Sequence, residues 1–342
     1  MESRILRGES AQYYECGYSC DHALLLAVGE TKWFITDGRY TTEAKESGCT
    51  AQVIESDNLI KTARALIRQS GEKRFIIDPK EWSLEAYDQL AKKLPRVRFS
   101  KKPDYSPLAR CVKTADEIAL IERAVQENAE AFELIAAFLN SEGEGLEEAL
   151  LHFQAKSFLQ NGGRRDISFE PIFAINANAA KPHALPTATP LKRGDLVLLD
   201  AGTKYRRYCS DRTRTALFGD HGLRFELKQS LGDKKRQEIY DLVLKAHDQA
   251  IEAARPGMEA RELDRIARSV IEAAGYGKYF NHSLGHGVGL DIHEHPYINR
   301  RNPMRLEEGM VFTIEPGIYL PGEFGVRIED VVVLENGRAR IL

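Results

Sequence analysis

The sequence predicts two domains, an α/β domain followed by a larger α+β domain. At 342 residues, the chain is longer than a single hydrophobic core usually supports, because chains divide into domains beyond roughly 250–300 residues. In the first part, short apolar runs alternate with amphipathic segments, as in α/β proteins. In the last part, strand-like segments flank grouped helices, which favours α+β over a doubly wound parallel sheet. A capping-box signature separates the two parts, so we expect domains at 1–112 and 113–342.

The elements of the first domain follow from apolar periodicity. We expect strands in HALLLAV, KWFIT, RFIID and VRFS, and helices in residues 59–69 and 84–94. Pro103 and Pro107 interrupt the pattern after the last strand, since proline continues neither a helix nor a central strand. These elements make a module of about 110 residues, a common domain size.

The second domain opens at Thr114 and Glu117, which have the spacing of a capping box. The helix that follows has apolar residues at helical spacing: Ile118, Ile121, Val125, Phe132 and Ile135. A second helix begins near Leu146 and ends at the glycines 162–163, which readily adopt the left-handed conformation that ends helices. We then expect strands in ISFEPIFAI, DLVLLDAGT and YCSDRTRTALF, helices in residues 234–254 and 260–274, and final strands in MVFTIEPGIY and GVRIEDVVVL.

Composition and charge argue against several classes of protein. With 43% hydrophobic and 29% charged residues, the chain is typical of folded globular proteins. Its net charge of −3, with 48 basic residues spread among 51 acidic ones, provides no basic face for nucleic acid. No apolar run approaches the roughly 18 residues of a membrane span, and MESRILRGES lacks the apolar core of a secretory signal. We therefore expect a cytoplasmic protein that binds neither nucleic acid nor membrane.

Five cysteines form an odd, dilute set, which we interpret as reduced thiols in a cytoplasm. Cys16, Cys20 and His22 lie as close together as zinc ligands would. Because no second ligand pair follows at a suitable spacing, buried thiols near a strand are the favoured interpretation. Cys209 lies two residues before Asp211, and the sequence indicates no chemical role for it.

Four acidic residues lie in otherwise apolar strand segments. They are Asp200 in LVLLD, Asp211 in CSDRT, Glu315 in FTIEP and Glu329 in RIEDV. A buried carboxylate is costly unless it is paired or bound to a metal, and close carboxylates raise one another's pKa unless cations intervene. A strand cap or a local arginine would explain any one of these acids, but four together favour a pair of divalent ions.

Three histidines, His282, His286 and His293, occur in the stretch HSLGHGVGLDIHE. The first two have the spacing of a helical zinc pair. The glycines between them and after them would each cost a helix roughly 1 kcal/mol against alanine, which argues against a helix. They resemble a dinucleotide-binding loop only loosely, since no strand–turn–helix unit surrounds them. A strand that a metal or peptide approaches closely fits better, and His286 then supplies a nitrogen ligand.

The chain resembles the pita-bread metallopeptidases, which comprise proline-specific aminopeptidases, prolidases and methionine aminopeptidases. Four motifs carry the resemblance in the same order: DAGTKYRRYCSDRTRT, HSLGHGVGLDIHEHP, TIEPGIY and VRIED. They cover nearly all of residues 165–342. By size and α/β pattern, the first domain resembles the creatinase-type domain of the proline-specific branch. The resemblance implies an α+β pita-bread catalytic domain preceded by a smaller α/β creatinase-type domain.

The resemblance implies five ligands for two divalent metal ions, with Mn²⁺ as the first choice and Co²⁺ or Zn²⁺ as alternatives. The ligands are Asp200, Asp211, His286, Glu315 and Glu329. Asp211 and Glu329 would bridge both ions, Asp200 would bind one ion, and His286 with Glu315 would bind the other. A carboxylate-rich set suits hard or borderline ions.

The resemblance also implies catalytic or substrate-contacting roles for His183, His282, His293, Glu315 and Arg327. His293 would stabilise the oxyanion, the other two histidines would contact substrate or intermediate, and Glu315 would carry a proton to the leaving nitrogen. Arg327 would bind substrate or orient a ligand, and pairing with a ligand carboxylate is the alternative. The chain departs from the family at INAN, residues 175–178, where a Ser-Gly-x-Asn turn is usual.

We therefore expect an Xaa-Pro aminopeptidase, a homodimer that cleaves peptides with proline at the second position. The alternative is an Xaa-Pro dipeptidase, or prolidase, which must bind the carboxylate next to the proline. Some prolidases carry an arginine where this chain has Tyr297, which favours the aminopeptidase. Arg300 and Arg301 lie close by and leave the choice open. Creatinase shares the architecture but lacks the metal ligands. A non-enzymatic pita-bread protein that binds peptides or proteins is the third possibility, although such relatives have lost ligands that this chain retains.

Overall fold

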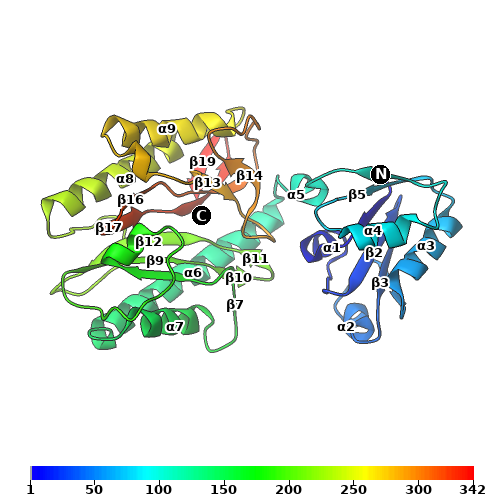
Figure 1. Cartoon of the computed structure of the whole chain (residues 1–342), viewed down its shortest axis with the longest axis horizontal. Coiled ribbons are helices and arrows are strands. Elements are labelled where there is room, and N and C mark those ends of the chain that lie inside the picture. The colour runs from blue at the N-terminus through cyan, green and yellow to red at the C-terminus, as the bar shows by residue number, and fades with distance from the viewer. Residues whose placement is uncertain (1) are drawn as a thin grey trace. The chain divides into compact units, whose positions relative to one another are not determined.

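The computed structural model describes residues 2–342. The chain forms two compact units, of which the first ends at Arg110 and the second is Cys111–Leu342 (Figure 1). The predicted fold class, an α/β domain followed by an α+β pita-bread domain, is confirmed. Among residues 2–342, none of the helices combines the length and the apolar character that a bilayer span needs.

The first unit is built on a six-stranded mixed sheet. Its strand order is β4 (Gln52–Glu55), β3 (Thr31–Thr36), β2 (Ala23–Val28), β1 (Arg4–Leu6), β5 (Arg74–Ile77) and β6 (Arg98–Lys101). Its helices are α1 (Glu9–Cys16), α2 (Thr41–Glu46), α3 (Leu59–Ser70), α4 (Leu84–Ala91) and α5 (Tyr105–Ala109). The sequence pattern did not reveal β1, β4, α1, α2 or α5, because these elements are short, at three to eight residues each.

Both faces of this sheet are covered, because successive residues of a strand point to opposite sides. In β2, Leu24 and Leu26 pack in one apolar cluster with residues of α3 and α4, whereas Leu25 packs in another with residues of α1 and α2. Cys16 and Cys20 are buried in the second cluster, in agreement with their interpretation as buried thiols.

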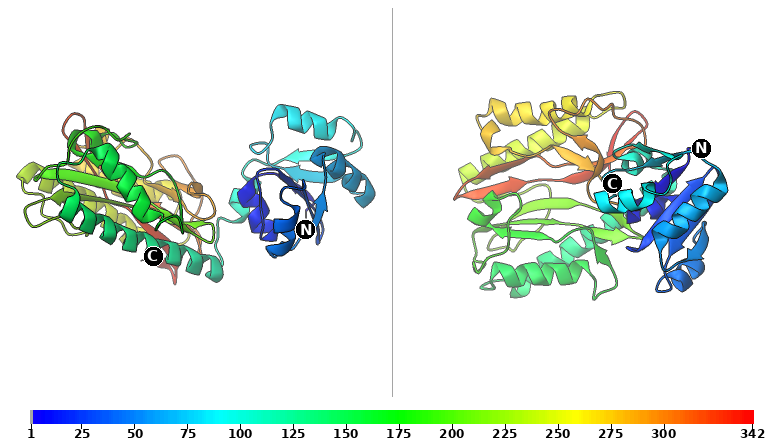
Figure 2. Two further views of the ribbon diagram at one scale, coloured as in Figure 1. Left: turned by 90° about the horizontal axis from the view of Figure 1, so that it is seen from below. Right: turned by 45° about the vertical axis from the view of Figure 1, so that its right-hand side comes forward.

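The second unit contains two helix pairs and the strands between them. The helices are α6 (Ala115–Glu142) with α7 (Glu148–Leu159), and α8 (Lys234–Ala253) with α9 (Ala260–Ala273). Figure 1 and the right panel of Figure 2 show one pair on each side of the strands. The predicted capping box of α6 is confirmed, since the Glu117 amide donates to Thr114 Oγ1 at 3.3 Å and the Thr114 amide donates to Glu117 Oε2 at 2.9 Å.

The α6–α7 pair covers a three-stranded sheet of order β12 (Arg212–Phe218), β9 (Asp195–Ala201) and β8 (Ile172–Ile175). Beside it lie the short strands β7 (Asp166–Ile167), β10 (Thr203–Tyr205) and β11 (Tyr208–Cys209), and the 3₁₀ turn η1 (Asn176–Ala180).

The α8–α9 pair covers a five-stranded sheet of order β14 (Glu294–Ile298), β13 (Gly285–Gly287), β15 (Val311–Ile314), β18 (Asp330–Glu335) and β19 (Arg338–Ile341). The hairpin β16 (Gly317–Leu320) and β17 (Phe324–Arg327), and the turn η2 (Gly277–Tyr279), complete this half.

The two halves of the second unit meet where β12 passes the connection from β17 to β18. There an isolated antiparallel bridge joins Thr213 to Glu329, and the Glu329 amide donates to the Thr213 carbonyl at 3.1 Å. The sequence pattern treated MVFTIEPGIY and GVRIEDVVVL as continuous strands. In the structure each is interrupted, the first at Glu315 and Pro316 and the second at Ile328 and Glu329, so both glutamates lie at strand ends.

Candidate metal centre

The nine candidate residues from the sequence line one cavity of about 750 Å³ in the second unit. They are His183, Asp200, Asp211, His282, His286, His293, Glu315, Arg327 and Glu329. Asp200 lies in β9 and His286 in β13, while Asp211, Glu315 and Glu329 lie at the ends of strands. The fold therefore brings together residues that are more than a hundred positions apart in the sequence.

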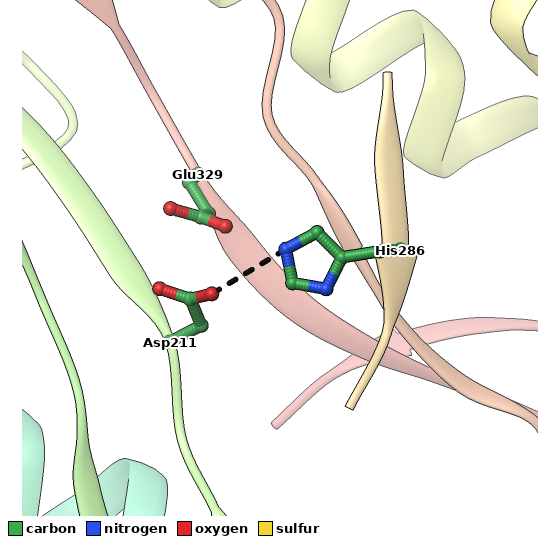
Figure 3. A group of neighbouring side chains, drawn as sticks. All are labelled: Asp211, His286 and Glu329. Atoms are coloured by element: carbon green, nitrogen blue, oxygen red, sulfur yellow. Dashed lines mark ion pairs between the residues drawn. The ribbon is translucent and has the colours of Figure 1, made fainter. Parts of the chain in front are cut away.

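Asp211, His286 and Glu329 form the tightest group in this cavity. One potential ligand atom from each residue lies within 4.8 Å of the other two, and all three side chains are buried. Figure 3 shows the three side chains pointing toward one another from different segments of the chain. His286 Nε2 is 3.6 Å from Asp211 Oδ2 and 3.4 Å from Glu315 Oε1, so a second glutamate borders the group.

The protonation of His286 suits a metal ligand. Its Nδ1 lies 3.2 Å from the Gly287 carbonyl oxygen, which can only accept, so Nδ1 carries the hydrogen. Burial, followed by nearby His293, lowers the pKa of His286 to about 3, so the ring is neutral and Nε2 presents a lone pair. This lone pair faces carboxylate oxygens, which are also hydrogen-bond acceptors, so the two repel each other. A cation bound between them would make the arrangement favourable.

The buried carboxyl groups of the site lie close together, and a cation between them would stabilise their charged forms. Burial, followed by repulsion from neighbouring carboxylates, raises the pKa of Asp211 and the pKa of Glu329 well above their ordinary values. Burial raises the pKa of Glu315 to about 8. Within residues 2–342, Asp200 Oδ1 and Asp211 Oδ1 are buried oxygens without a hydrogen-bond partner. Uncompensated buried oxygens of this kind fit a divalent metal ion.

Without bound metal, the free energy of unfolding should fall as the pH rises from about 6.5 to 8. The folded chain there keeps protons on the raised carboxyl groups that the unfolded chain has released, which costs up to about 1.4 kcal/mol per proton and pH unit. Below pH 6.5 the effect of His286 and His282 opposes this trend, since burial lowers the pKa of each to about 3. Melting temperatures of chelated protein at several pH values measure the slope.

Adding Mn²⁺ provides the control for this pH dependence, because a cation among the carboxylates removes the reason for their raised pKa values. We expect the slope between pH 6.5 and 8 to become flat or to reverse. An unchanged slope with and without the ion would show that these carboxylates do not bind it.

Arg327 is buried and is held by the site itself. Its guanidinium donates to Asp200 Oδ2 at 2.5 Å, to Thr213 Oγ1 at 3.0 Å and to the Tyr319 hydroxyl oxygen at 2.8 Å. Of the two roles considered from the sequence, pairing with a ligand carboxylate is therefore the one that this geometry fits. Thr213 also donates to Glu329 Oε2 at 2.6 Å, so one hydroxyl connects the arginine to a second candidate ligand.

Tyr319 was not a candidate from the sequence, although it lies in the motif TIEPGIY. Burial raises the pKa of Tyr319 to about 12, so its hydroxyl is neutral and donates to His282 Nε2 at 2.9 Å. The Nδ1 of His282 donates to the Ser283 carbonyl at 2.7 Å. Burial, followed by Arg327, lowers the pKa of His282 to about 3. A chain of hydrogen bonds therefore runs from Asp200 through the arginine and the tyrosine to His282.

His183 and His293 are exposed and line the cavity without such a chain. The ring of His293 lies edge-on to that of His286, with 4.2 Å between the centroids. The residue after it, Glu294, forms an ion pair with Lys113 at 2.9 Å, and both of these side chains are only 1% exposed. This buried pair fixes the backbone that carries His293.

The loop that carries His183 is shaped by the INAN segment. The Asn178 side chain donates to the Leu185 carbonyl at 2.9 Å and to Glu148 Oε1 at 2.6 Å. Glu148 is fully buried and also accepts from the amides of Ile175 and Thr187. Glu148 thus binds the backbone on both sides of the loop that carries His183. In this chain the loop begins with INAN, where the family usually has a Ser-Gly-x-Asn turn.

The glycines of HSLGHGVG lie close to neighbouring protein atoms. A Cβ at Gly285 would overlap the Thr313 backbone, and one at Gly287 would overlap the backbone of His295. At Gly289 a Cβ would collide with the Glu294 carboxylate. Neighbouring protein atoms therefore occupy the position that a Cβ would take at each glycine, which explains the absence of side chains there. Gly285 also lines the cavity, so the approach of a ligand to this strand stays a prediction.

Comparison with known proteins places these residues in a family. Residues 119–336 match metallopeptidase family M24, and residues 2–112 match the creatinase/prolidase N-terminal domain. The Xaa-Pro dipeptidase of Pyrococcus furiosus is 42% identical over 244 residues, or 71% of this chain. The matched region covers 66% of that dipeptidase, just under two thirds of its length.

Solved structures agree over the full length of the chain. A prolidase from Pyrococcus horikoshii superimposes with a TM-score of 0.87 and 33% identity, covering 100% of this chain and 93% of that one. An X-Pro aminopeptidase from Thermotoga maritima superimposes with a TM-score of 0.88 and 29% identity, covering 100% and 95%. The chain therefore belongs to metallopeptidase family M24, as its motifs predict, and begins with the creatinase/prolidase N-terminal domain.

Proposed function

We propose that the protein is an Xaa-Pro dipeptidase with a dinuclear metal centre. Membership of a metallopeptidase family implies divalent metal ions, and the buried group of carboxylates around His286 fits them. The single observation that supports the site best is that this group lies in the cavity together with the exposed histidines His183 and His293. We assign the ligand roles to Asp200, Asp211, His286, Glu315 and Glu329.

The proposal replaces the aminopeptidase that the sequence favoured. The P. furiosus relative is named an Xaa-Pro dipeptidase and the P. horikoshii structure a prolidase, so the comparisons favour the alternative. The aminopeptidase remains the second candidate, because the T. maritima structure is named an X-Pro aminopeptidase and Tyr297 occupies the position of the expected arginine. The retained ligands argue against the non-enzymatic pita-bread protein.

When bound, divalent ions would supply Lewis acidity that lowers the pKa of water from about 15.7 toward neutrality. The protein's own groups then have separate tasks. His293 donates a hydrogen bond to the carbonyl oxygen as negative charge develops on it. Glu315 accepts a proton from the attacking water and delivers it to the departing proline nitrogen. Arg327, held by Tyr319 and Thr213, keeps Asp200 in place.

The walls of the cavity suit a small apolar substrate. Phe169, Pro171, Ile172, Pro182 and Ile292 line it beside the charged residues. A proline ring and a short side chain would bury apolar surface there, while the carbonyl between them faces the histidines.

A comparison of peptide lengths tests the proposal. We expect kcat/KM for an Xaa-Pro dipeptide to exceed that for the matching Xaa-Pro-Yaa tripeptide by at least about tenfold. The Xaa-Ala dipeptide is the control, and its slow hydrolysis would demonstrate the requirement for proline. A preference for the tripeptide would instead make the protein an aminopeptidase.

Mn²⁺ is the proposed ion, because carboxylate-rich sites suit hard or borderline metals, with Co²⁺ and Zn²⁺ as the alternatives. Assays after chelation and addition of each single metal rank the three. The homodimer proposed from the resemblance is measured by light scattering of the purified protein, and the cytoplasmic location stays a prediction.

A further inference from the structure

A second buried charged cluster lies behind the candidate metal centre and belongs to none of the roles above. It consists of Arg214 in β12, Asp330 at the start of β18, and His247 in α8. The exposed fractions of the three residues are 3%, 8% and 0%. Charged groups this deeply buried need a structural or functional reason.

The cluster lies on the opposite side of β12 from the metal centre. Successive side chains of a strand point to opposite faces, so Thr213 points toward the site, where its hydroxyl donates to Glu329 Oε2 at 2.6 Å. Arg214 points away and donates through Nη1 to the Thr213 carbonyl at 2.9 Å and to the Glu329 carbonyl at 2.6 Å. Arg214 therefore binds the backbone of both residues at the bridge between the halves.

The remaining contacts hold Arg214 in this position. Its Nη2 donates to Asp330 Oδ1 at 2.6 Å. The other carboxylate oxygen of Asp330, Oδ2, is 3.2 Å from His247 Nε2, and His247 Nδ1 is 3.0 Å from Asp248 Oδ1. The cluster thus connects helix α8 through β18 to strand β12, from one half of the unit to the other.

The two proposed bridging ligands also come from the two halves. Asp211 directly precedes β12, three residues before Arg214, and Glu329 directly precedes Asp330. Any change in the spacing between β12 and the start of β18 would therefore move these carboxylates relative to each other. Such movement should weaken metal binding. Mutation of groups that orient metal ligands typically lowers metal affinity 10–100-fold.

We propose that Arg214, Asp330 and His247 are positioning residues that fix the separation of Asp211 and Glu329 and so set the affinity of the centre for divalent ions. The inference rests on the proposed metal centre. It goes further by assigning a role in metal binding to three residues that contact neither the ions nor the substrate.

Arg214→Lys is the first test. Lysine keeps the charge but has no planar fork with which to reach two carbonyls and a carboxylate together. We expect the dissociation constant for Mn²⁺, measured by calorimetry on the metal-free full chain, to rise by about tenfold or more. His247→Gln, which keeps a polar side chain of similar reach, is the milder second variant, with an expected rise of several-fold. It keeps the test decisive if the first variant does not fold.

Leu263→Ala is the matched control, because Leu263 is fully buried in the same half and lies outside the cluster. It should lower the melting temperature while the dissociation constant stays within about twofold of wild type, since truncating a core leucine mainly reduces stability. If Arg214→Lys and His247→Gln lower the melting temperature but leave Mn²⁺ affinity unchanged, the cluster is only structural and the inference is wrong. If the wild-type chain binds no Mn²⁺, the proposed metal centre itself fails, which is a separate outcome.

Discussion

Asp211→Asn should reduce kcat/KM for an Xaa-Pro dipeptide by on the order of 10³-fold or more, equivalent to about 4 kcal/mol of transition-state stabilisation. The amide has the shape of the carboxylate but cannot bridge two cations. We also expect at least one divalent ion per chain to be lost. Activity assays and metal analysis of the same preparation measure both effects.

The Asp211→Asn variant should nevertheless fold. Burial and neighbouring carboxylates raise the pKa of Asp211 well above its ordinary value, so the carboxylate destabilises the metal-free folded state at neutral pH and a neutral amide does not. The metal-free variant should therefore melt no lower than metal-free wild type. Asp220→Asn, at an exposed position nearby in the sequence, is the matched control and should retain full activity. A variant that keeps both ions and activity within tenfold of wild type would refute the ligand assignment.

Arg327→Met should lower the free energy of unfolding of the metal-free protein by about 3–5 kcal/mol, because Asp200 is left buried without its partner. Activity should fall by about two orders of magnitude, since a displaced ligand misplaces the reacting groups. Urea unfolding followed by circular dichroism and steady-state kinetics measure these changes. Adding metal should recover part of the stability, as a cation next to Asp200 replaces the lost charge.

A double-mutant cycle separates the ion pair from general packing. Asp200→Asn combined with Arg327→Met should cost less stability than the arginine substitution alone, because no unpaired charge then remains. Arg224→Met, at a side chain that is 81% exposed, should change the unfolding free energy by less than about 1 kcal/mol. Strict additivity of the two site substitutions would show that Asp200 and Arg327 are not coupled.

The sequence predicted the candidate metal ligands, because each of them has a residue type that is unusual for its local sequence. Acidic residues in apolar strands, such as Asp200 in LVLLD, stand out wherever they occur, and His286 follows from the motif. The same reasoning placed the domain change at the capping box of Thr114. These features can be recognised from neighbouring residues alone, without knowledge of the tertiary structure.

The surrounding network depends on which strands meet, and the sequence pattern does not contain that information. Tyr319 appears as an ordinary apolar residue of a strand until β16 is placed beside Arg327. The sequence does not show that the Thr313 backbone occupies the position a Cβ of residue 285 would take, which requires glycine there. The role of Arg214 could not be inferred from the sequence, because its contact with the Glu329 carbonyl spans 115 positions.

The choice between dipeptidase and aminopeptidase depends on how the end of the substrate is recognised. Tyr297 in place of an arginine led the sequence analysis toward the aminopeptidase, whereas the P. furiosus and P. horikoshii relatives are named a dipeptidase and a prolidase. The single residue Tyr297 does not define the pocket that recognises the end of the substrate, because residues from several segments line it.

We propose above that the buried carboxylates and His286 hold a pair of divalent ions that the reaction requires. The most direct measurement is a titration of the metal-free protein with Mn²⁺ while hydrolysis of an Xaa-Pro dipeptide is followed. We predict no hydrolysis without metal, and activity that rises until two ions are bound per chain. Hydrolysis that is unaffected by chelation, or a chain that binds no divalent ion, would contradict the claim.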